Sequence, residues 1–343
     1  MTTPKILAKR ICLVRLSAIG DAVHAIALVN ALREIYPRAH LTWILEPLPY
    51  EVVRQQTNVD RFIVFDSRQG SWAFRELREA LGGCRYDLLI LPQVSFRSSL
   101  VAAHVKAHYK LGFDWNRSRE LHWVFTNRHL ETGPNRHAQD LMLEFASHLG
   151  LEDWDPHWGI RFSEDETSEM ARFFGEMDRK AVSLVVASSN PARDWAPARY
   201  AELADRIDSE LKLQAVLVGG PSSRERAVVD EILSQTTSAP VVALDKPLRT
   251  TMWKLAGSRV VVSPDTGPLH IAVSMNRPTV GLYGYTNPRR VGPYRRFHDL
   301  LVDAYTDPGE EDGRITRKTK PGRMDRITVD AVMEKVRLAL ERY

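Results

Sequence analysis

Two aspartates stand where a short apolar run gives way to a polar loop, and their side chains could do chemistry. Asp21 ends the loop Ser17-Ala18-Ile19-Gly20-Asp21, and Asp265 stands in the loop Ser263-Pro264-Asp265-Thr266-Gly267. A carboxylate in such a loop can remove a proton from a positioned hydroxyl group, or it can accept hydrogen bonds from sugar hydroxyls. We interpret Asp21 as a candidate general base and Asp265 as a candidate sugar contact. The simpler alternative is that both aspartates cap helices.

The loop that contains Asp265 leads directly into a predicted helix. Pro268 follows Gly267 at the first helical turn, where the missing N–H group of a proline costs nothing. The start of a helix offers unpaired N–H groups and the positive end of the helix dipole, which together favour an anion such as a diphosphate. The stretch from Arg259 to Tyr285 therefore predicts a strand, a candidate anion site, a helix and a second strand.

A third polar loop follows the apolar run 181–187. It contains Ser188, Ser189 and Arg193, and two hydroxyl groups with a guanidinium group suit contacts to phosphate. The alternative is a polar surface loop in which Arg193 pairs with Asp194 or faces solvent. The sequence alone leaves both interpretations open.

Further patterns bear on nucleotide and metal binding. Ser222-Ser223-Arg224-Glu225 matches the S-x-x-E capping box, although Glu225 could instead bind a ribose. The loop after the first apolar run lacks two of the three spaced glycines of the dinucleotide fingerprint, which argues against NAD. Asp153-Trp154-Asp155 has the D-x-D pattern of some metal-bound nucleotide sites, but it does not follow a strand. We therefore expect no metal ion and no other cofactor.

Alternating strands and helices have to position these loops. Apolar, β-branched runs predict strands, and periodic apolar positions between them predict helices. In the first half the predicted strands are 11–14, 40–45, 61–65 and 86–91, and the predicted helices are 21–36 and 71–81. In the second half the predicted strands are 181–187, 213–218, 260–262 and 279–283, and the predicted helices start at Pro197, near Ser222 and at Pro268. This alternation predicts an α/β protein built from parallel βαβ units.

The alternating pattern divides into two series. Residues 149–180 are rich in Trp, Pro, Asp and Glu, and they interrupt the alternation. We therefore predict an N-terminal domain at 1–158 and a C-terminal domain at 159–325. Each is expected to be a doubly wound sheet with helices on both faces.

The end of the chain carries two further features. An apolar stripe of Val332, Val336 and Leu340 predicts an amphipathic helix at 326–343, which could pack back on the first domain. The preceding stretch 307–323 is charged and contains glycine, so we predict a mobile loop there.

Composition limits the class of protein. Hydrophobic residues make up 44% and charged residues 26% of the 343 residues, which is ordinary for a globular protein and excludes a disordered or fibrous chain. The net charge of +4 and the pI of about 9.0 suit an anionic substrate or a membrane surface, but they are too small to indicate nucleic acid. Cys12 and Cys84 predict free thiols in a reducing compartment. We find no apolar stretch of the roughly 20 residues that span a bilayer, and Arg15 interrupts the N-terminal apolar run, so we expect a cytoplasmic protein.

Taken together, the motifs resemble the heptosyltransferases, the bacterial glycosyltransferases of family 9 that build the lipopolysaccharide inner core. The resemblance extends over nearly the whole chain. The matching residues are Val14-Arg15-Leu16-Ser17-Ala18-Ile19-Gly20-Asp21-Ala22-Val23-His24, Arg193-Asp194-Trp195, and Ser263-Pro264-Asp265-Thr266-Gly267-Pro268-Leu269-His270 with Tyr283-Gly284.

The resemblance implies a fold and a reaction. The fold is the GT-B arrangement, in which two Rossmann-like domains face each other across a cleft. The reaction is an inverting, metal-independent transfer from ADP-L-glycero-β-D-manno-heptose to an anionic core acceptor that contains Kdo or heptose on lipid A. The acceptor implies peripheral contact with the inner face of the inner membrane.

The resemblance also implies roles for individual residues. Asp21 matches the proposed base, with Arg193 as its catalytic partner at the diphosphate. The residues expected at the donor are Ser188, Ser189, Glu225, Asp265, Thr266, Gly267 and His270. The residues expected at the acceptor are Ser17, Gly20, Arg97 and Arg119.

The chain departs from the family pattern at the donor. Arg193 stands where heptosyltransferase I has a lysine, and a guanidinium fork differs in geometry from an ammonium group. The acid that serves the nucleoside is displaced, with Ser223 near its place and Glu225 two positions further on. The alternatives are therefore a transferase or epimerase that uses another nucleotide sugar, and a sugar-nucleotide-binding protein without catalysis.

Overall fold

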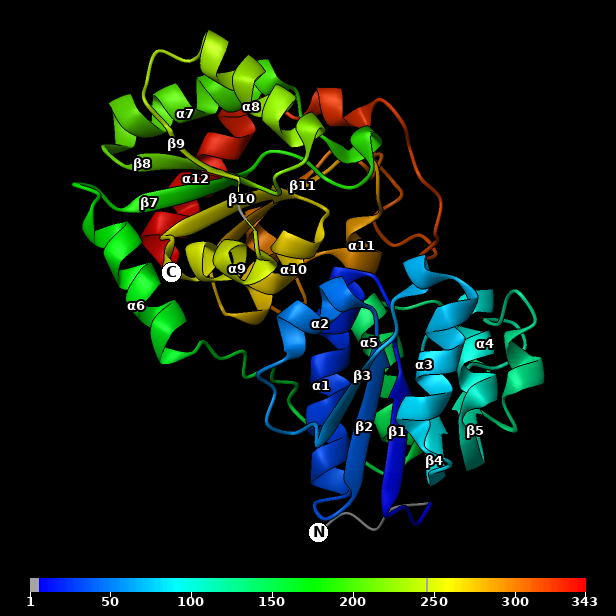
Figure 1. The fold of residues 1–343 in the computed structure, drawn as a ribbon. Helices are drawn as coiled ribbons and strands as arrows, with labels where there is room; N and C mark the ends of the chain where they lie inside the picture. The colour runs from blue at the N-terminus through cyan, green and yellow to red at the C-terminus, as the bar shows by residue number, and fades with distance from the viewer. Residues whose placement is uncertain (1–5, 245) are drawn as a thin grey trace. The chain divides into compact units, whose positions relative to one another are not determined.

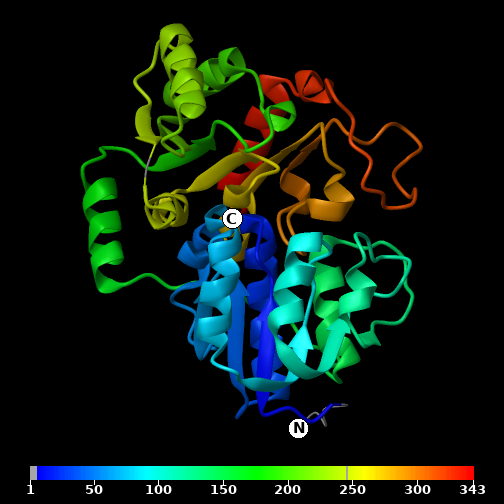
Figure 2. The same ribbon diagram turned by 45° about the vertical axis from the view of Figure 1, so that its right-hand side comes forward.

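The computed structural model describes residues 6–244 and 246–343, which form two compact units. The first unit runs to Pro134 and continues from Ala138 to Ile160. The second unit contains Asn135–His137 and Arg161–Tyr343. The chain therefore passes from one unit to the other close to the predicted boundary between residues 158 and 159. Within each unit, helices flank a central sheet (Figures 1 and 2).

The first unit is built on a parallel sheet of six strands in the order β3-β2-β1-β4-β5-β6. This is the strand order of the Rossmann fold. The strands are β1 (Arg10–Val14), β2 (His40–Leu45), β3 (Arg61–Val64), β4 (Arg85–Ile90), β5 (Lys106–Gly112) and β6 (Arg128–His129). Every residue of β1 after Arg10 is buried, which explains the unbroken apolar run in the sequence.

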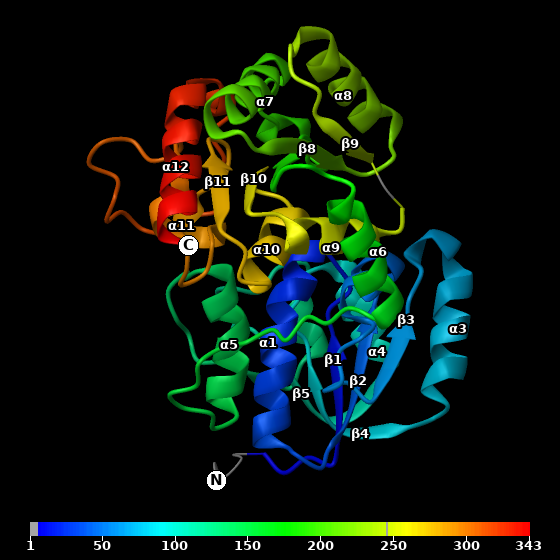
Figure 3. The same ribbon diagram turned by 90° about the vertical axis from the view of Figure 1, so that its left-hand side faces the viewer.

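Helices cover both faces of this sheet. α1 packs against α2 and α5, and α3 packs against α4; Figure 3 shows the two groups on opposite faces. The helices are α1 (Ile19–Ile35), α2 (Pro47–Val53), α3 (Ser71–Leu81), α4 (Phe96–His104) and α5 (Ala138–His148), with 3₁₀ turns η1 (Ser67–Gln69) and η2 (His122–Phe125). One apolar core joins Ala73 and Leu77 of α3 to the strand residues Val14 and Leu89.

The second unit repeats the same architecture. Its parallel sheet has the order β12-β11-β10-β7-β8-β9, which is again the Rossmann order when the strands are counted from β7. The strands are β7 (Ala181–Val185), β8 (Gln214–Gly219), β9 (Val241–Leu244), β10 (Val260–Pro264), β11 (Thr279–Tyr283) and β12 (Leu301–Asp303). The prediction of an α/β protein with two Rossmann-like units is confirmed.

The helices of the second unit also lie on both faces of its sheet (Figure 3). α7 packs against α8 and α12, whereas α9 packs against α6 and α10. The helices are α6 (Glu164–Gly175), α7 (Pro197–Leu211), α8 (Ser223–Gln235), α9 (Leu248–Gly257), α10 (Gly267–Ser274), α11 (Pro288–Val291) and α12 (Val329–Arg342), with 3₁₀ turns η3 (Pro191–Arg193), η4 (His298–Leu300) and η5 (Arg323–Arg326).

The final helix is an integral part of the second unit. Val332, Met333 and Val336 of α12 are buried in the same apolar core as Val262 of β10 and Leu282 of β11. The expectation that this helix packs back on the first domain stays a prediction. Its apolar stripe is covered by the sheet of its own unit.

Glycine and proline mark the ends and starts of helices in this fold. Gly82 follows α3 in the left-handed conformation (φ 54°) and donates its N–H to the carbonyl groups of Arg78 and Glu79. Pro197 opens α7 at a position where no helical N–H is needed. Within the described residues, no helix combines the length and apolar character needed to cross a membrane.

Candidate functional site

The two sheets place the predicted loops at equivalent positions. In a doubly wound sheet, ligands bind beyond the carboxyl ends of the strands where the strand order reverses. That point lies between β1 and β4 in the first unit and between β7 and β10 in the second. The segments that follow these four strands contain Asp21, in the first turn of α1, and Gln93, Arg193 and Asp265. Each unit therefore has one half-site.

In the first half-site, Asp21 lies in the first turn of α1 and pairs with a buried arginine. Its Oδ2 atom is 2.6 Å from Nη2 of Arg15 and accepts the N–H of Ala18 at 3.2 Å. Both contacts use Oδ2, and Oδ1 has no hydrogen-bond partner among the described residues. The carboxylate is 40% exposed. Asp21 can therefore receive a substrate hydroxyl group at its second oxygen.

The surroundings of Asp21 keep the carboxylate ionised. Desolvation raises its pKa, but the positive charge of Arg15, the neighbouring His24 and the N–H group of Ala18 outweigh that effect, so the pKa lies below its ordinary value. An ionised carboxylate is the form that a general base requires.

A glutamine that the sequence analysis did not single out connects the loops after β1 and β4. Oε1 of Gln93 accepts the N–H groups of Leu16 at 2.7 Å and Ser17 at 3.4 Å, and its Nε2 reaches the hydroxyl of Ser17 at 3.5 Å. Arg15 strengthens the same connection because its Nη1 donates to the carbonyl of Pro92 at 2.9 Å. Gln93 follows a predicted strand, but only the strand order shows that β4 lies next to β1.

Of the predicted acceptor residues, Ser17 and Gly20 adjoin Asp21, whereas the two arginines come from other loops. Nη1 of Arg97, in α4, donates to Oε1 of Glu46 at 2.9 Å and to the hydroxyl of Ser67 at 3.3 Å. Arg119 is exposed in the loop after β5. All four lie beyond the carboxyl ends of the first sheet, and their contact with an acceptor stays a prediction.

Buried His122 gives the first unit a pH dependence. Burial lowers the pKa of His122 from 6.5 to about 4. Below pH 6.5 the imidazole of His122 is protonated in the unfolded chain but stays neutral in the folded chain until the pH approaches 4. The free energy of unfolding therefore falls as the pH falls from 6.5 toward 4. We expect His122→Gln to reduce the loss of unfolding free energy between pH 7.5 and 4.5 by about 2–3 kcal/mol. Urea unfolding at both pH values checks this. The exposed His40→Gln control should retain the wild-type loss, and an equal loss in the His122 variant would contradict the prediction.

In the second half-site, the structure brings together two motifs that are far apart in the sequence. Nη1 of Arg193 donates to the carbonyl of Asp265 at 3.1 Å and lies 3.3 Å from its Oδ2. Asp194 instead pairs with Arg224. The alternative in which Arg193 pairs with Asp194 is therefore wrong, because Asp194 turns toward α8 while Arg193 turns toward β10.

Asp265 is buried and held on both of its oxygens. Oδ2 accepts the hydroxyl of Thr286 at 2.8 Å, and Oδ1 lies 3.5 Å from Nε2 of His270. Burial raises the pKa of Asp265, but His270, Arg193 and Thr286 outweigh it, so the pKa lies below its ordinary value. The buried carboxylate is thus charged and fixed. Thr286 follows β11, and no motif in the sequence indicates that it contacts Asp265.

Arg193 retains the capacity to bind an anion. Its recorded side-chain contacts use Nη1, and its buried Nε has no hydrogen-bond partner among the described residues. Gly267, two residues after Asp265, begins α10, and the side chain of the N-cap residue Thr266 makes no hydrogen bond to this helix. Free guanidinium N–H groups and an uncapped helix start are both suited to phosphate oxygens.

The serine loop after β7 is held by a different set of contacts. The hydroxyl of Ser188 donates to the carbonyl of Asn190 at 2.6 Å, and its N–H group donates to Oδ1 of Asp194 at 2.7 Å. Arg224 binds both Asp194 and the carbonyl of Ser188. Ser188 therefore shapes the loop, whereas Ser189 is exposed.

Glu225 lies at the turn after β8. Its Oε1 accepts the N–H of Gly220 at 2.7 Å, and its own N–H donates to the hydroxyl of Ser222 at 3.2 Å. Ser222 thus caps α8, while the Glu225 carboxylate closes the glycine turn. This corrects the complete capping box, in which the glutamate would return to the backbone of the capping serine.

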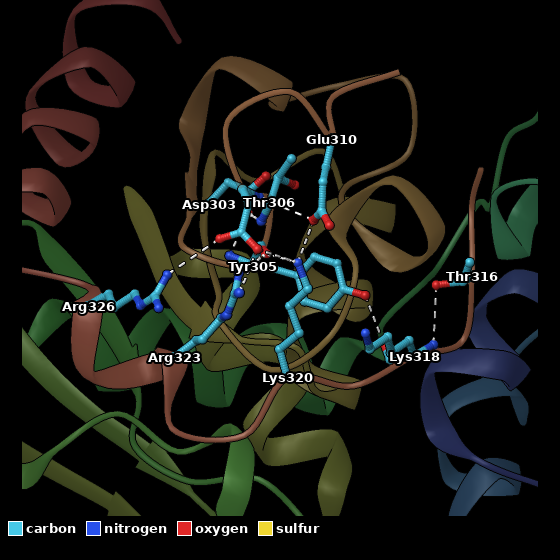
Figure 4. Close-up of polar contacts among 10 residues, drawn as sticks. Asp303, Tyr305, Thr306, Glu310, Thr316, Lys318, Lys320, Arg323 and Arg326 are labelled. Carbon is cyan, nitrogen blue, oxygen red and sulfur yellow. Dashed lines mark hydrogen bonds and ion pairs between the residues drawn. The ribbon is translucent and has the colours of Figure 1, made fainter. Parts of the chain in front are cut away.

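The charged stretch near the end of the chain is tied at its base by ion pairs (Figure 4). Asp307 binds Lys320 at 3.0 Å and Arg323 at 2.6 Å, and Arg323 also donates to the carbonyl of Tyr305 at 2.6 Å. The N–H group of Lys320 donates to the carbonyl of Tyr285, the neighbour of Thr286, at 3.0 Å. The loop predicted to be mobile is thus anchored next to the second half-site.

We expect loss of this anchor to open the loop. Arg323 and Lys320 hold the pKa of Asp307 well below its usual range, so the carboxylate is charged at neutral pH. Asp307→Asn should increase the rate of tryptic cleavage after Arg314 or Arg317 by roughly fivefold. Limited proteolysis with mass spectrometry measures this. The control is Asp312→Asn, an exposed site in the same loop, and equal rates in both variants would exclude an anchoring role.

The structure can be searched for side chains that could hold a metal ion. Across the described parts of the chain, no group of three or more His, Cys, Asp or Glu side chains is placed to hold a metal ion. The D-x-D motif at 153–155 lies in the first unit, away in sequence from the strands that frame the half-sites.

The fold and the half-sites define the class of protein. Two Rossmann-like units in one chain, with a half-exposed carboxylate in one and Arg193 beside a buried carboxylate in the other, correspond to a GT-B glycosyltransferase. The sequence model of glycosyltransferase family 9 (heptosyltransferase) matches residues 74–309. The chain belongs to this family.

Individual relatives agree with this assignment. The chain is 31% identical to the lipopolysaccharide core heptosyltransferase OpsX of Haemophilus influenzae over 305 residues, which cover 89% of this chain and 87% of OpsX. A family 9 glycosyltransferase from Veillonella parvula has the same fold, with a TM-score of 0.84, 22% identity and 98% of both chains covered. The E. coli heptosyltransferase WaaC, solved with ADP, gives a TM-score of 0.75 at 23% identity over 96% of this chain and 99% of WaaC.

Proposed function

We propose that the protein transfers heptose from ADP-L-glycero-β-D-manno-heptose to an anionic lipopolysaccharide inner-core acceptor, with inversion and without a metal ion. Family membership and the similarity to OpsX support heptosyl transfer. The ADP bound by WaaC supports an adenine nucleotide as the donor. The observation that carries the proposal is the contrast between Asp21, with one oxygen open, and Asp265, with both oxygens engaged.

The second half-site would bind the donor. The free guanidinium N–H groups of Arg193 and the first N–H groups of α10 would bind the diphosphate, with Ser189 at the loop edge and Glu225 toward the nucleoside. Charge grows on the diphosphate as the glycosidic bond breaks, and fixed donors stabilise that charge without reorganising. Asp265 holds Arg193 and His270 in place and lies near the sugar.

The first half-site would activate the acceptor. The acceptor hydroxyl would donate to Oδ1 of Asp21, which takes its proton as the new bond to the anomeric carbon forms. Attack from the face opposite the departing ADP inverts the configuration in one displacement. Such a displacement needs one base and no covalent enzyme intermediate, which fits a single open carboxylate at this half-site.

The negative charge and the lipid anchor of the proposed acceptor indicate where in the cell the protein would act. Arg97 and Arg119 supply positive charge for anionic core sugars, and the acceptor is anchored in a membrane by its lipid. We therefore propose a cytoplasmic protein that acts peripherally at the inner face of the inner membrane.

Calorimetric titration of the purified protein tests the donor. ADP-heptose, ADP, a GDP-sugar and a UDP-sugar are titrated without metal and then with magnesium. We expect ADP-heptose to bind most tightly, with no change on adding magnesium. Preference for another nucleotide would replace the donor, and a requirement for magnesium would contradict the metal-free site.

The variant Asp265→Ala should distinguish binding of the donor sugar from binding of the nucleotide. The variant removes the carboxylate that Thr286, His270 and Arg193 surround. We expect ADP-heptose binding to weaken by at least roughly tenfold, the effect of losing one charged hydrogen bond, and ADP binding to weaken less. Calorimetry measures both ligands. Thr286→Val serves as a milder control because it leaves the charge in place, and equal weakening of both ligands by Asp265→Ala would reject a sugar-side role.

A further inference from the structure

The loop after β5 exposes several large apolar side chains to solvent. We call residues 113–125 the aromatic loop. Trp115 is 65% and Leu121 57% exposed, and Trp123, Val124 and the adjoining Phe96 are also exposed. The rings of Trp115 and Trp123 are in contact, with centroids 4.5 Å apart. These side chains form one patch beside α4, because η2 packs against that helix.

Arg117 of the aromatic loop points the opposite way. The side chain of Arg117 is 7% exposed and forms ion pairs with Asp114 and Glu144. Its Nη2 also donates to the carbonyl of Glu131 at 2.7 Å. The loop thus buries Arg117 at its base and presents its tryptophans to the outside. Such an arrangement is costly in water unless another surface covers the apolar side chains.

The backbone also holds the apolar side chains outward. Glu120 and Leu121 both adopt left-handed conformations, with φ of 50° and 60°, which are strained for residues other than glycine. Oε2 of Glu120 accepts the N–H group of Phe96 at 2.6 Å and so fixes this turn to the start of α4. The exposure of Leu121 therefore results from a defined, anchored turn.

We propose that the aromatic loop docks the protein on the surface of a bilayer rich in anionic phospholipid. Tryptophan is enriched at membrane interfaces because its ring is apolar and its N–H group can stay hydrated. Exposed Arg119 within the loop places positive charge beside the patch, where anionic headgroups would lie, whereas the charge of Arg97 on α4 is already paired with Glu46. The proposal rests on the proposed function in one respect: a lipid-anchored acceptor requires the enzyme to reach a membrane.

The test uses vesicles without any sugar acceptor. The full-length protein is mixed with vesicles of phosphatidylglycerol and phosphatidylethanolamine, or with vesicles of phosphatidylcholine, and bound protein is measured by flotation. We expect binding to the phosphatidylglycerol vesicles and weaker binding to phosphatidylcholine. The double variant Trp115→Ser, Trp123→Ser should bind roughly tenfold or more weakly. Trp72→Ser, at a tryptophan that is 53% exposed on α3, is the matched control and should bind as wild type does.

Fluorescence quenching and ADP titration distinguish membrane docking from misfolding and from self-association. Phospholipids with brominated chains should quench wild-type tryptophan fluorescence, and this quenching should fall in the double variant. ADP titration of each variant verifies folding and tests the donor independently, so failure of ADP-heptose binding with normal docking would reject the proposed function alone. No vesicle binding by the wild type, or equal binding by the double variant, would overturn the docking proposal. Self-association that depends on Trp115 and Trp123 would also overturn it, because a second copy would then cover the patch.

Discussion

Asp21→Asn is expected to reduce the rate of heptosyl transfer by about a thousandfold, within the range that general bases contribute. The amide keeps the shape of the side chain and can still accept hydrogen bonds from Arg15 and Ala18, but it cannot take a proton. Binding of ADP-heptose should stay within about twofold of wild type, because the proposed donor contacts are in the second unit. Turnover is measured by mass spectrometry of the acceptor, and binding by calorimetry.

A matched control distinguishes loss of the base from loss of an ion pair. Asp60 pairs with Arg33 at 2.7 Å and accepts the N–H of Leu41 at 2.7 Å, at the amino end of the same sheet. Asp60→Asn should lower stability and leave the turnover of the folded protein unchanged. Near wild-type turnover in Asp21→Asn would remove Asp21 as the base.

Arg193→Met should also have a large effect on the chemical step. The loss of one fixed donor to a developing negative charge costs about 3 kcal/mol of transition-state stabilisation, so the transfer rate should fall by roughly 100- to 1000-fold. The methionine retains the apolar stem of the side chain. Transfer rates at saturating donor measure this effect, and donor titration shows how much of it is ground-state binding.

Two further variants make the Arg193 result specific. Arg193→Lys restores a positive charge without the guanidinium fork, and it should recover most of the lost rate if charge dominates. Arg226→Met, at an exposed arginine of α8, should have no effect. If Arg193→Met transfers heptose at the wild-type rate, the diphosphate is stabilised by other groups.

The repeating elements could be predicted from the sequence because their signals are local. The strands at 40–45 and 279–283 and the helix at 71–81 have the predicted bounds. Buried parallel strands are continuous apolar runs, and Gly82 and Pro197 mark a helix end and a helix start. The family resemblance rested on loop motifs that follow such strands.

The contacts that complete each half-site could not be predicted, because they depend on which strands become neighbours. Gln93 reaches the Ser17 loop only because β4 pairs with β1, and Thr286 reaches Asp265 only because β11 pairs with β10. The partner of Arg193 is likewise set by the pairing of β7 with β10. A polar residue after a strand gives no sign of its neighbour until the strand order is known.

The loop at 307–323 and the final helix show a second limit of local reasoning. Charge and glycine predict mobility, yet opposite charges such as Asp307 and Arg323 can close a loop on itself. An amphipathic stripe predicts that α12 buries one face, but it does not identify the sheet that covers that face.

The central claim is tested most directly by incubating the purified protein with ADP-heptose and a Kdo-containing lipid A acceptor, without metal, and analysing all products. We expect the acceptor to gain one heptose and ADP to be released in equal amount. NMR spectroscopy of the product should show the anomeric configuration opposite to that of the donor. A second incubation with donor alone should leave ADP-heptose unchanged. An altered donor without acceptor would indicate an epimerase, and tight donor binding with no product would indicate a binding protein; either result would contradict heptosyl transfer.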